Sequence, residues 1–272
     1  MKFKKIYVEI TNKCNLNCSF CSKLKRQLKT MSKDEFKHVI SEIKPYTDYI
    51  YLHLKGEPLI HPDLEDILKI AKENNIIVNI TTNGTKLSDT LDIIKNCGCL
   101  RQVNISLQAM EQVKDKDSYL KNVIKLIEIS KEKNFFVSLR IWVNNVDVNN
   151  YIKEFFGNNL IEEYKNVFWS YDEEFKWPTL DDEVVSKYGT CLGTRTHVGV
   201  LVNGDVVPCC LDGNGCIVLG NIFKEKFEDI LKSSRFTEMR EGLLKNILKE
   251  ELCQKCTYRR KWDSNEKINN WL

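Results

Sequence analysis

The sequence lacks any long uninterrupted stretch of apolar residues. A transmembrane helix needs roughly 20 consecutive apolar residues, and the 272-residue chain contains no comparable run. We therefore expect no membrane-spanning segment. The N-terminal segment MKFKKIYVEITNKC also lacks the apolar block and the small-residue cleavage site of a secretory signal. This pattern predicts a cytoplasmic protein.

A strong excess of charge of either sign is also missing. The chain has 41 Lys and Arg residues against 38 Asp and Glu residues, which gives a formal net charge of +3. Such a balance gives no support for a nucleic acid or an anionic membrane as a partner. Internal repeats and low-complexity tracts are absent too. The chain is long enough for one large core, or for one core with a small appended module.

Cysteine, in contrast, is abundant, with 11 residues in the chain. A reducing cytosol does not favour structural disulfides, so clustered cysteines there indicate metal or redox chemistry. Oxygen-sensitive clusters would further indicate an anaerobic or microaerobic host.

Strand patterns alternate with helix patterns over the first two thirds of the chain. Such alternation is typical of βαβ units around a parallel sheet. Six units suit an open, partial barrel better than a closed eight-fold one. The predicted strands are Lys5–Thr11, Tyr49–Leu54, Ile76–Thr81, Arg101–Leu107, Phe135–Val143 and Asn166–Tyr171. The predicted helices are Lys33–Lys44, Asp63–Glu73, Ser88–Asn96, Asp117–Lys133 and Val148–Phe156.

The pattern changes near residue 172. An acidic and aromatic segment over 172–188 is typical of a linker, and the Asn203-Gly204 pair predicts a tight β-hairpin. A helix is expected from about Lys226 to Lys249. The predicted fold is therefore α/β: a partial (β/α)6 barrel over residues 1–175, followed by a small α+β module over 176–272.

The first cysteine group lies directly after the first predicted strand. Cys14, Cys18 and Cys21 are separated by three and then two residues. Three thiolates can hold three irons of a [4Fe–4S] cube and leave the fourth iron without a protein ligand. Zinc knuckles and ribbons usually pair two-residue spacings, so zinc fits this group poorly.

This spacing, together with Phe20 just before the third cysteine, resembles the radical S-adenosylmethionine (AdoMet) superfamily. The resemblance implies that the open iron binds the amino and carboxylate groups of AdoMet. One electron, from a donor such as flavodoxin or ferredoxin, would then release a 5′-deoxyadenosyl radical that abstracts hydrogen from a substrate.

Further segments resemble the AdoMet-binding parts of that family. Lys55-Gly56-Glu57-Pro58 is similar to its Gly-Gly-Glu-Pro segment, with Lys55 as a departure. Ordinary turn or strand-end roles stay open for Asn83, Ser106 and Arg140. The cofactor-binding residues that the resemblance implies are Phe20, Gly56, Glu57, Asn83, Ser106 and Arg140.

A second cysteine group occupies the C-terminal third. Cys191, Cys209, Cys253 and Cys256 can complete a tetrahedral ligand set, and their chemistry alone does not distinguish zinc from an iron–sulfur cluster. The remaining cysteines are expected to be structural, with Cys210 or Cys216 as alternative ligands.

The order of this second group resembles the SPASM auxiliary-cluster domain, in which a glycine lies five residues before the second cysteine, as Gly204 does here. No cysteine follows Cys256, so the similarity is to the shortened, twitch form. The layout is similar to that of the 2-deoxy-scyllo-inosamine dehydrogenases. The resemblance implies one auxiliary [4Fe–4S] cluster, and hence two clusters in the chain.

Three functions follow from these patterns. The first is radical oxidation of a small molecule with help from the auxiliary cluster. The second is modification of a peptide or protein by the same chemistry. The third is a non-enzymatic four-cysteine zinc protein. The sequence identifies no catalytic acid or base, and it does not identify the substrate.

Overall fold

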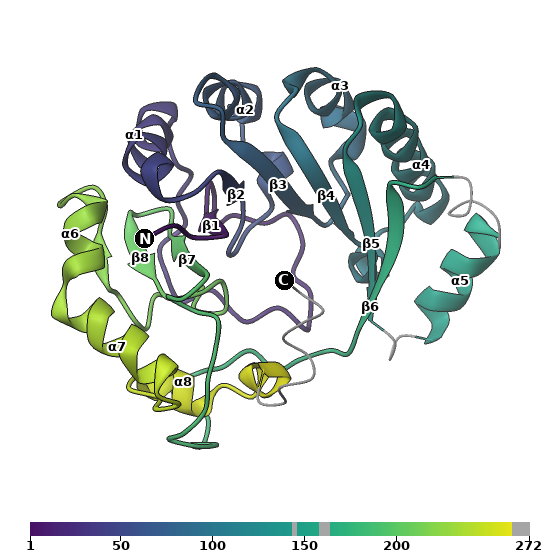
Figure 1. The fold of residues 1–272 in the computed structure, drawn as a ribbon. Coiled ribbons are helices and arrows are strands. Elements are labelled where there is room, and N and C mark those ends of the chain that lie inside the picture. The colour runs from purple at the N-terminus through teal and green to yellow at the C-terminus, as the bar shows by residue number, and fades with distance from the viewer. Residues whose placement is uncertain (143–145, 158–163, 263–272) are drawn as a thin grey trace.

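The fold is a single mixed β-sheet with helices packed on its outer face (Figure 1). The computed structural model describes residues 1–142, 146–157 and 164–262. Its nine strands have the order β6-β5-β4-β3-β2-β1-β7-β8-β9. Residue 143, the end of one predicted strand, lies outside the described residues.

The first six strands are parallel, and each is paired with its neighbour in sequence. Among the described residues, the two edge strands β6 and β9 are not paired with each other, so the sheet is not closed into a barrel. The predicted partial six-strand barrel is thus confirmed. The six strands are β1 (Lys5–Val8), β2 (Tyr49–Tyr51), β3 (Ile77–Thr82), β4 (Leu100–Ser106), β5 (Phe136–Trp142) and β6 (Val167–Asp172).

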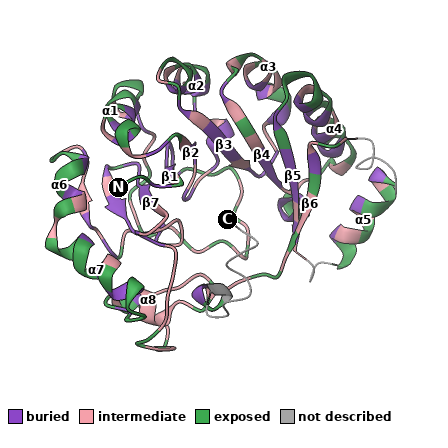
Figure 2. Ribbon diagram, viewed as in Figure 1, coloured by how far each residue is buried: buried purple, intermediate pink, exposed green. Residues whose placement is uncertain are grey.

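Five helices cover the outer face of these strands. Ser32 and Glu35 form a reciprocal capping box at the start of the first helix, which satisfies backbone N–H groups that the helix leaves unpaired. Ile6 and Val8 of β1 are fully buried in the main core cluster, whereas Tyr7 between them belongs to a separate cluster, as alternation along a strand requires. Buried residues are frequent along the strands, and exposed residues are frequent on the helices (Figure 2). The helices are α1 (Lys33–Ile43), α2 (Leu64–Glu73), α3 (Leu87–Cys97), α4 (Lys116–Lys133) and α5 (Val146–Phe156).

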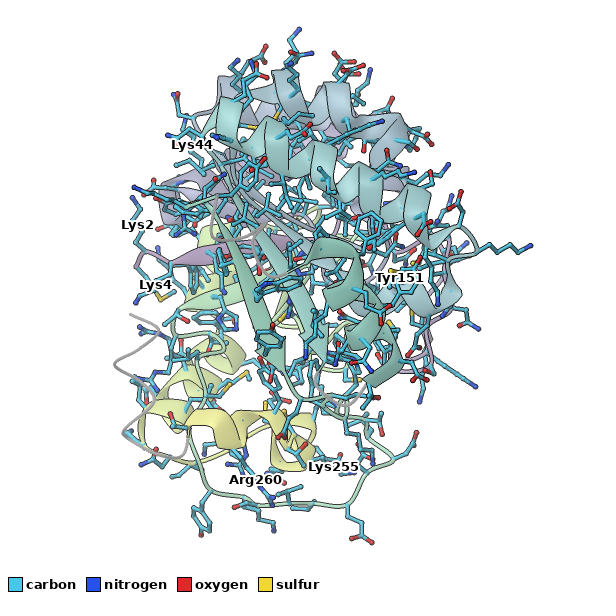
Figure 3. All side chains as sticks on the ribbon, turned by 90° about the vertical axis from the view of Figure 1, so that its right-hand side faces the viewer. Lys2, Lys4, Lys44, Tyr151, Lys255 and Arg260 are labelled. Atoms are coloured by element: carbon cyan, nitrogen blue, oxygen red, sulfur yellow. The ribbon has the colours of Figure 1, made fainter. Side chains whose placement is uncertain are left out.

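The C-terminal part extends the same sheet. Strand β7 (His197–Val200) pairs parallel with β1, and β8 (Asp205–Val207) pairs antiparallel with β7 and with β9 (Gly220–Asn221). The predicted hairpin at Asn203-Gly204 is therefore confirmed. Charged side chains such as those of Lys2 and Lys44 project outward from the molecule (Figure 3).

The single helix predicted from Lys226 to Lys249 is wrong. Ser233 has an extended backbone, and its hydroxyl accepts a hydrogen bond from the backbone N–H of Phe236, so the chain starts a new helix at that point. Two helices replace it, α6 (Phe227–Lys232) and α7 (Ser234–Leu244), and α8 (Glu251–Lys255) follows.

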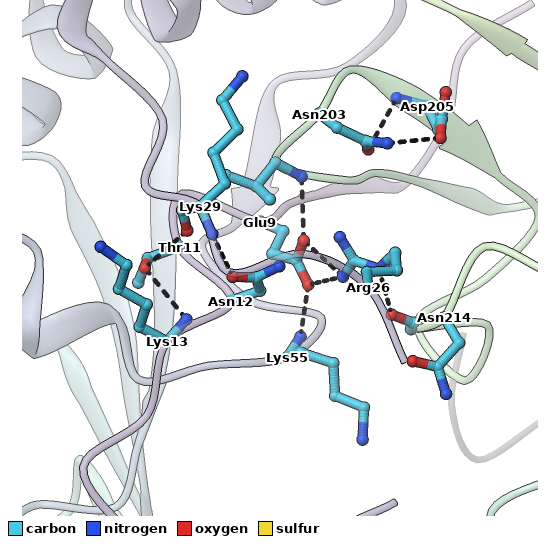
Figure 4. Close-up of polar contacts among 12 residues, drawn as sticks. Glu9, Thr11, Asn12, Lys13, Arg26, Lys29, Lys55, Asn203, Asp205 and Asn214 are labelled. Atoms are coloured by element: carbon cyan, nitrogen blue, oxygen red, sulfur yellow. Dashed lines mark hydrogen bonds and ion pairs between the residues drawn. The ribbon is translucent and has the colours of Figure 1, made fainter. Parts of the chain in front are cut away.

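A buried ion pair ties the barrel to the C-terminal part (Figure 4). The Glu9 carboxylate, fully buried after β1, accepts two hydrogen bonds from the Arg26 guanidinium at 2.6 and 2.8 Å. It also accepts the backbone N–H groups of Lys55 and Val202, at 3.2 and 3.0 Å. Arg26 in turn donates to the carbonyl of Gly213 at 2.9 Å. Four parts of the chain therefore meet at this carboxylate, and Arg26 links them to a fifth at Gly213.

None of the helices in the described ranges combines the length and the apolar character needed to cross a membrane.

Candidate active site

The loop that carries the first three cysteines is clamped at its neck. A β-bridge joins Thr11 to Thr30, where the chain leaves β1 and approaches α1. The Asn12 side chain donates to the Gln27 carbonyl at 2.9 Å and accepts the Lys29 N–H at 2.8 Å. The loop between these residues is therefore held at the carboxyl end of β1, the edge of a parallel sheet where active sites are built.

The three thiols lie close enough to influence one another. Burial, followed by the neighbouring Cys14 and Cys21, raises the pKa of the Cys18 thiol to about 11. The Cys21 N–H donates to the Cys18 carbonyl at 3.1 Å and so folds this part of the loop into a turn. A bound cation would favour the thiolate forms, because neighbouring like charges oppose ionisation.

Two N–H donors from other loops point at these sulfurs. The side-chain amide of Asn83, after β3, lies 3.8 Å from the sulfur of Cys14. The ammonium nitrogen of Lys55, after β2, lies 3.5 Å from the sulfur of Cys21. Hydrogen bonds to sulfur are a feature of iron–sulfur sites, so the surroundings fit a cluster held by this loop.

Glu57 connects the loops after β2 and β3. Its carboxylate is 2 % exposed and accepts the Thr82 hydroxyl at 2.6 Å, the Asn83 N–H at 2.6 Å and the Leu59 N–H at 3.0 Å. Burial raises its pKa, and these three hydrogen bonds oppose the rise. A carboxylate can accept about four hydrogen bonds, so one position is left for the amino group that the sequence resemblance implies. That contact stays a prediction.

Gly56 lies directly against the cysteine loop. Its φ is +77°, and a Cβ atom there would stand 2.2 Å from the Thr11 carbonyl oxygen and 2.8 Å from that of Lys13. The backbone N–H of the next residue, Glu57, donates to the Lys13 carbonyl at 2.8 Å. This close approach of two backbones requires glycine.

A cavity of about 350 Å³ opens beside the cysteine loop. The Phe20 ring packs edge-on against Trp142 at a centroid distance of 4.2 Å and forms one wall. Gln108, which is 7 % exposed, has a side-chain oxygen without a hydrogen-bond partner among the described residues. The cavity is lined by Ser19, Phe20, Gln108, Glu111, Trp142, Val146, Asp147 and Glu174.

The aromatic wall and the carboxylates of this cavity suit a nucleoside that carries a positive charge. Sequence reasoning singled out Phe20, but it missed Trp142. The signal was present: Trp142 lies two residues beyond Arg140 in β5, so the two side chains share a face. Ser106 and Arg140 are direct partners in the β4–β5 register, which brings these predicted residues together at the same edge.

The four auxiliary cysteines also gather in one region. Burial raises the pKa of the Cys209 thiol, and Cys191 and Cys253 add to the effect. Cys256 likewise helps to raise the pKa of the Cys191 and Cys253 thiols. Their association, which links the segments before β7 and after β8 to α8 and its end, agrees with the predicted ligand set, although the ligand assignment itself stays a prediction.

The two alternative ligands behave differently. Cys210 packs against the cluster that contains Tyr7 of β1, and it helps to raise the pKa of the Cys209 and Cys191 thiols. Cys216 is exposed and interacts with Asp212 instead.

Within the described ranges, no three His, Cys, Asp or Glu side chains are arranged to hold a single metal ion. A cube takes each thiolate on a different iron, so its ligands need not converge on one point. Both cysteine groups of this chain offer only thiolates, and the first also has N–H donors beside its sulfurs, so both fit such cubes.

Comparison with known proteins gives two family matches. Residues 8–156 match the model of the radical SAM superfamily, and residues 191–257 match that of an iron–sulfur cluster-binding domain, SPASM. A probable GTP 3′,8-cyclase from Methanococcus maripaludis is 33% identical over 137 residues, which cover 45% of each chain. The chain thus spans less than half the length of this curated relative.

Solved structures show the same fold. BtrN in an open conformation aligns with a TM-score of 0.63 and 19% identity, over 94% of this chain and 93% of BtrN. A second BtrN structure is a complex with AdoMet and 2-DOIA. SuiB from Streptococcus suis, bound to its precursor peptide SuiA, aligns with a TM-score of 0.56 and 14% identity, over 97% of this chain and 74% of SuiB.

Proposed function

Because this chain belongs to the radical SAM superfamily and carries a SPASM domain, we propose that it cleaves AdoMet reductively and uses the resulting radical to oxidise a small-molecule substrate. The observation that carries the proposal is the position of the Cys14, Cys18 and Cys21 loop beside the cavity walled by Phe20 and Trp142. An iron–sulfur cube on this loop would supply one low-potential electron to the sulfonium of AdoMet, from which the 5′-deoxyadenosyl radical arises.

The residues of the chain have defined parts in this proposal. The three cysteines hold the cube, and the N–H donors of Asn83 and Lys55 lie against their sulfurs. Phe20 and Trp142 cover the adenine and exclude water from it.

The rest of the AdoMet cradle comes from the ends of four strands. Gly56 brings its backbone against the cysteine loop, and Glu57 orients the amino group of AdoMet. Arg140 binds its carboxylate, and Ser106, its neighbour in the β4–β5 register, binds the ribose. We further propose that the side chain of Asn83, besides its contact with Cys14, faces AdoMet.

Cys191, Cys209, Cys253 and Cys256 are the proposed ligands of an auxiliary [4Fe–4S] cluster. In an oxidation, the substrate loses a hydrogen atom to the radical and then a proton and an electron, and the auxiliary cluster would take the electron. We place the division between the barrel and the auxiliary module near residue 175, because the two family matches leave residues 157–190 between them. A flavodoxin or ferredoxin is the proposed electron donor.

The fold similarity to BtrN, which has been captured with AdoMet and 2-DOIA, supports a small-molecule substrate. The similarity to SuiB with its precursor peptide favours a second candidate, radical modification of a peptide. Both candidates require AdoMet cleavage, and they differ in the molecule that loses hydrogen.

Metal analysis after anaerobic reconstitution tests the cluster assignment. Two cubes correspond to about eight irons per chain, without stoichiometric zinc. Replacing the first three cysteines by Ala is expected to remove about four irons. Zinc in stoichiometric amount and no iron would contradict the proposal. Incubation with AdoMet, dithionite and deuterated candidate alcohols or peptides then identifies the substrate class by the transfer of deuterium into 5′-deoxyadenosine.

A further inference from the structure

Lys55 occupies a position where the similar family segment has glycine, and its side chain reaches the cysteine loop. The residue is 6 % exposed. Its backbone N–H donates to Glu9, while its side chain extends away from that carboxylate (Figure 4). The ammonium nitrogen lies 3.5 Å from the sulfur of Cys21 and 2.7 Å from the carbonyl oxygen of Ser22, and it also contacts the Ser22 hydroxyl. The side chain therefore ends at one of the proposed cluster ligands.

Two other segments hold this side chain in place. Its aliphatic stem packs on Gly213, where an added Cβ atom would stand 2.8 Å from the Cγ atom of Lys55. On the other side, the ammonium nitrogen lies 4.3 Å from the ring centroid of Trp177. The linker, the C-terminal module and the cysteine loop together fix the position of the nitrogen.

The acceptors around the nitrogen match the donors of an ammonium group. An ammonium group has three N–H bonds, and three acceptors face it: the Cys21 sulfur, the Ser22 carbonyl and the Ser22 hydroxyl. The aromatic face of Trp177 also favours a cation. A positive charge is thus positioned beside a cluster ligand, inside the protein, where solvent screens it little.

We propose that Lys55 raises the reduction potential of the barrel cluster. This inference rests on the proposed function, because it takes Cys21 as a cluster ligand. Reduction adds one electron, supplied by an external low-potential donor, and so adds one negative charge to the cluster. A fixed cation at 3.5 Å from a ligand sulfur stabilises the reduced form more than the oxidised form. Lys55 is a positioning residue that acts through Cys21 on the electron-accepting step.

The test is an anaerobic redox titration of the reconstituted protein, followed by electron paramagnetic resonance. Both clusters give signals when reduced, and the signal that changes when AdoMet is added marks the barrel cluster. Lys55→Met keeps an aliphatic chain against Gly213 and Trp177 and removes the charge. Lys55→Arg keeps the charge. Lys25→Met is the matched control, because Lys25 is an exposed lysine of the cysteine loop that pairs with Asp181.

In Lys55→Met, we expect the reduction equilibrium of the barrel cluster to move about tenfold or more toward the oxidised form, a shift of about 59 mV or more for one electron. Lys55→Arg and Lys25→Met are expected to stay near wild type, and the auxiliary signal serves as an internal reference. An unchanged barrel potential in Lys55→Met with normal iron content overturns the inference and leaves the proposed function standing. An equal shift in Lys25→Met also overturns it. Absence of any AdoMet-sensitive signal in the wild type overturns the proposed function itself.

Discussion

Replacing Gly56 with alanine tests the close packing between the loop after β2 and the cysteine loop. An L-residue at the φ of +77° costs about 1–2 kcal/mol. The new Cβ atom would also meet the Thr11 oxygen at 2.2 Å and the Asn12 Cα atom at 2.9 Å, both in the backbone. Forcing a group into such a packed site costs about 1–3 kcal/mol more. We therefore expect a loss of about 2–5 kcal/mol in the free energy of unfolding.

The chain offers a matched control for this substitution. Gly157 has a φ of +63°, and no described atom lies within 4 Å of its added Cβ atom. Gly157→Ala is therefore expected to lose about 1–2 kcal/mol, from the backbone strain alone. Urea unfolding of the metal-free variants measures both losses. In Gly56→Ala, a lower iron content after reconstitution would show that the cysteine loop has been displaced. If Gly56→Ala loses no more stability than Gly157→Ala, the proposed contact between the two backbones is refuted.

Three further predictions concern the buried ion pair, the half-buried His53 and His197, and the auxiliary cysteines. Arg26→Met leaves the fully buried Glu9 carboxylate without its ionic partner. We expect it to lower the free energy of unfolding in urea by about 3–5 kcal/mol, and a loss below about 1 kcal/mol would contradict the account. Burial lowers the pKa of both His53 and His197 to about 3, so stability is complete above the unfolded-state pKa of about 6.5 and declines below it. Each contributes at most about 1.4 kcal/mol per pH unit between pH 6.5 and 3, and a His53→Gln/His197→Gln variant should show a shallower pH slope. An unchanged slope argues against neutral imidazoles at these two positions. Cys209→Ala should lose about four irons and Cys216→Ala none, and equal losses would show the ligand set to be wrong.

The strand order of the barrel and the place of the first cysteine group could be predicted from local patterns. Alternation of strand and helix periods specifies parallel pairing of neighbours, and the loop after β1 then has to lie at the carboxyl edge of the sheet. The Asn203-Gly204 turn was equally predictable from the sequence, because few residue types adopt its backbone conformation. These features depend on residues that are near in sequence.

Other features depend on contacts between distant segments. The pairing of β7 with β1 joins His197 to Lys5 across the sheet, and no local pattern encodes that partner. The break at Ser233 was missed because the helical pattern resumes directly after it. Lys55 could be recognised only as a departure from a similar motif, since its contact with Cys21 requires the folded arrangement of both loops.

The central claim is that the first cysteine loop supports reductive cleavage of AdoMet. The most direct measurement is the release of 5′-deoxyadenosine from AdoMet and dithionite under anaerobic conditions. The wild type is compared with a variant in which Cys14, Cys18 and Cys21 are all replaced by Ala, and with Cys97→Ala, which alters a cysteine at the end of α3. We predict release by the wild type and by Cys97→Ala, and none by the triple variant. Equal release by the triple variant would contradict the account.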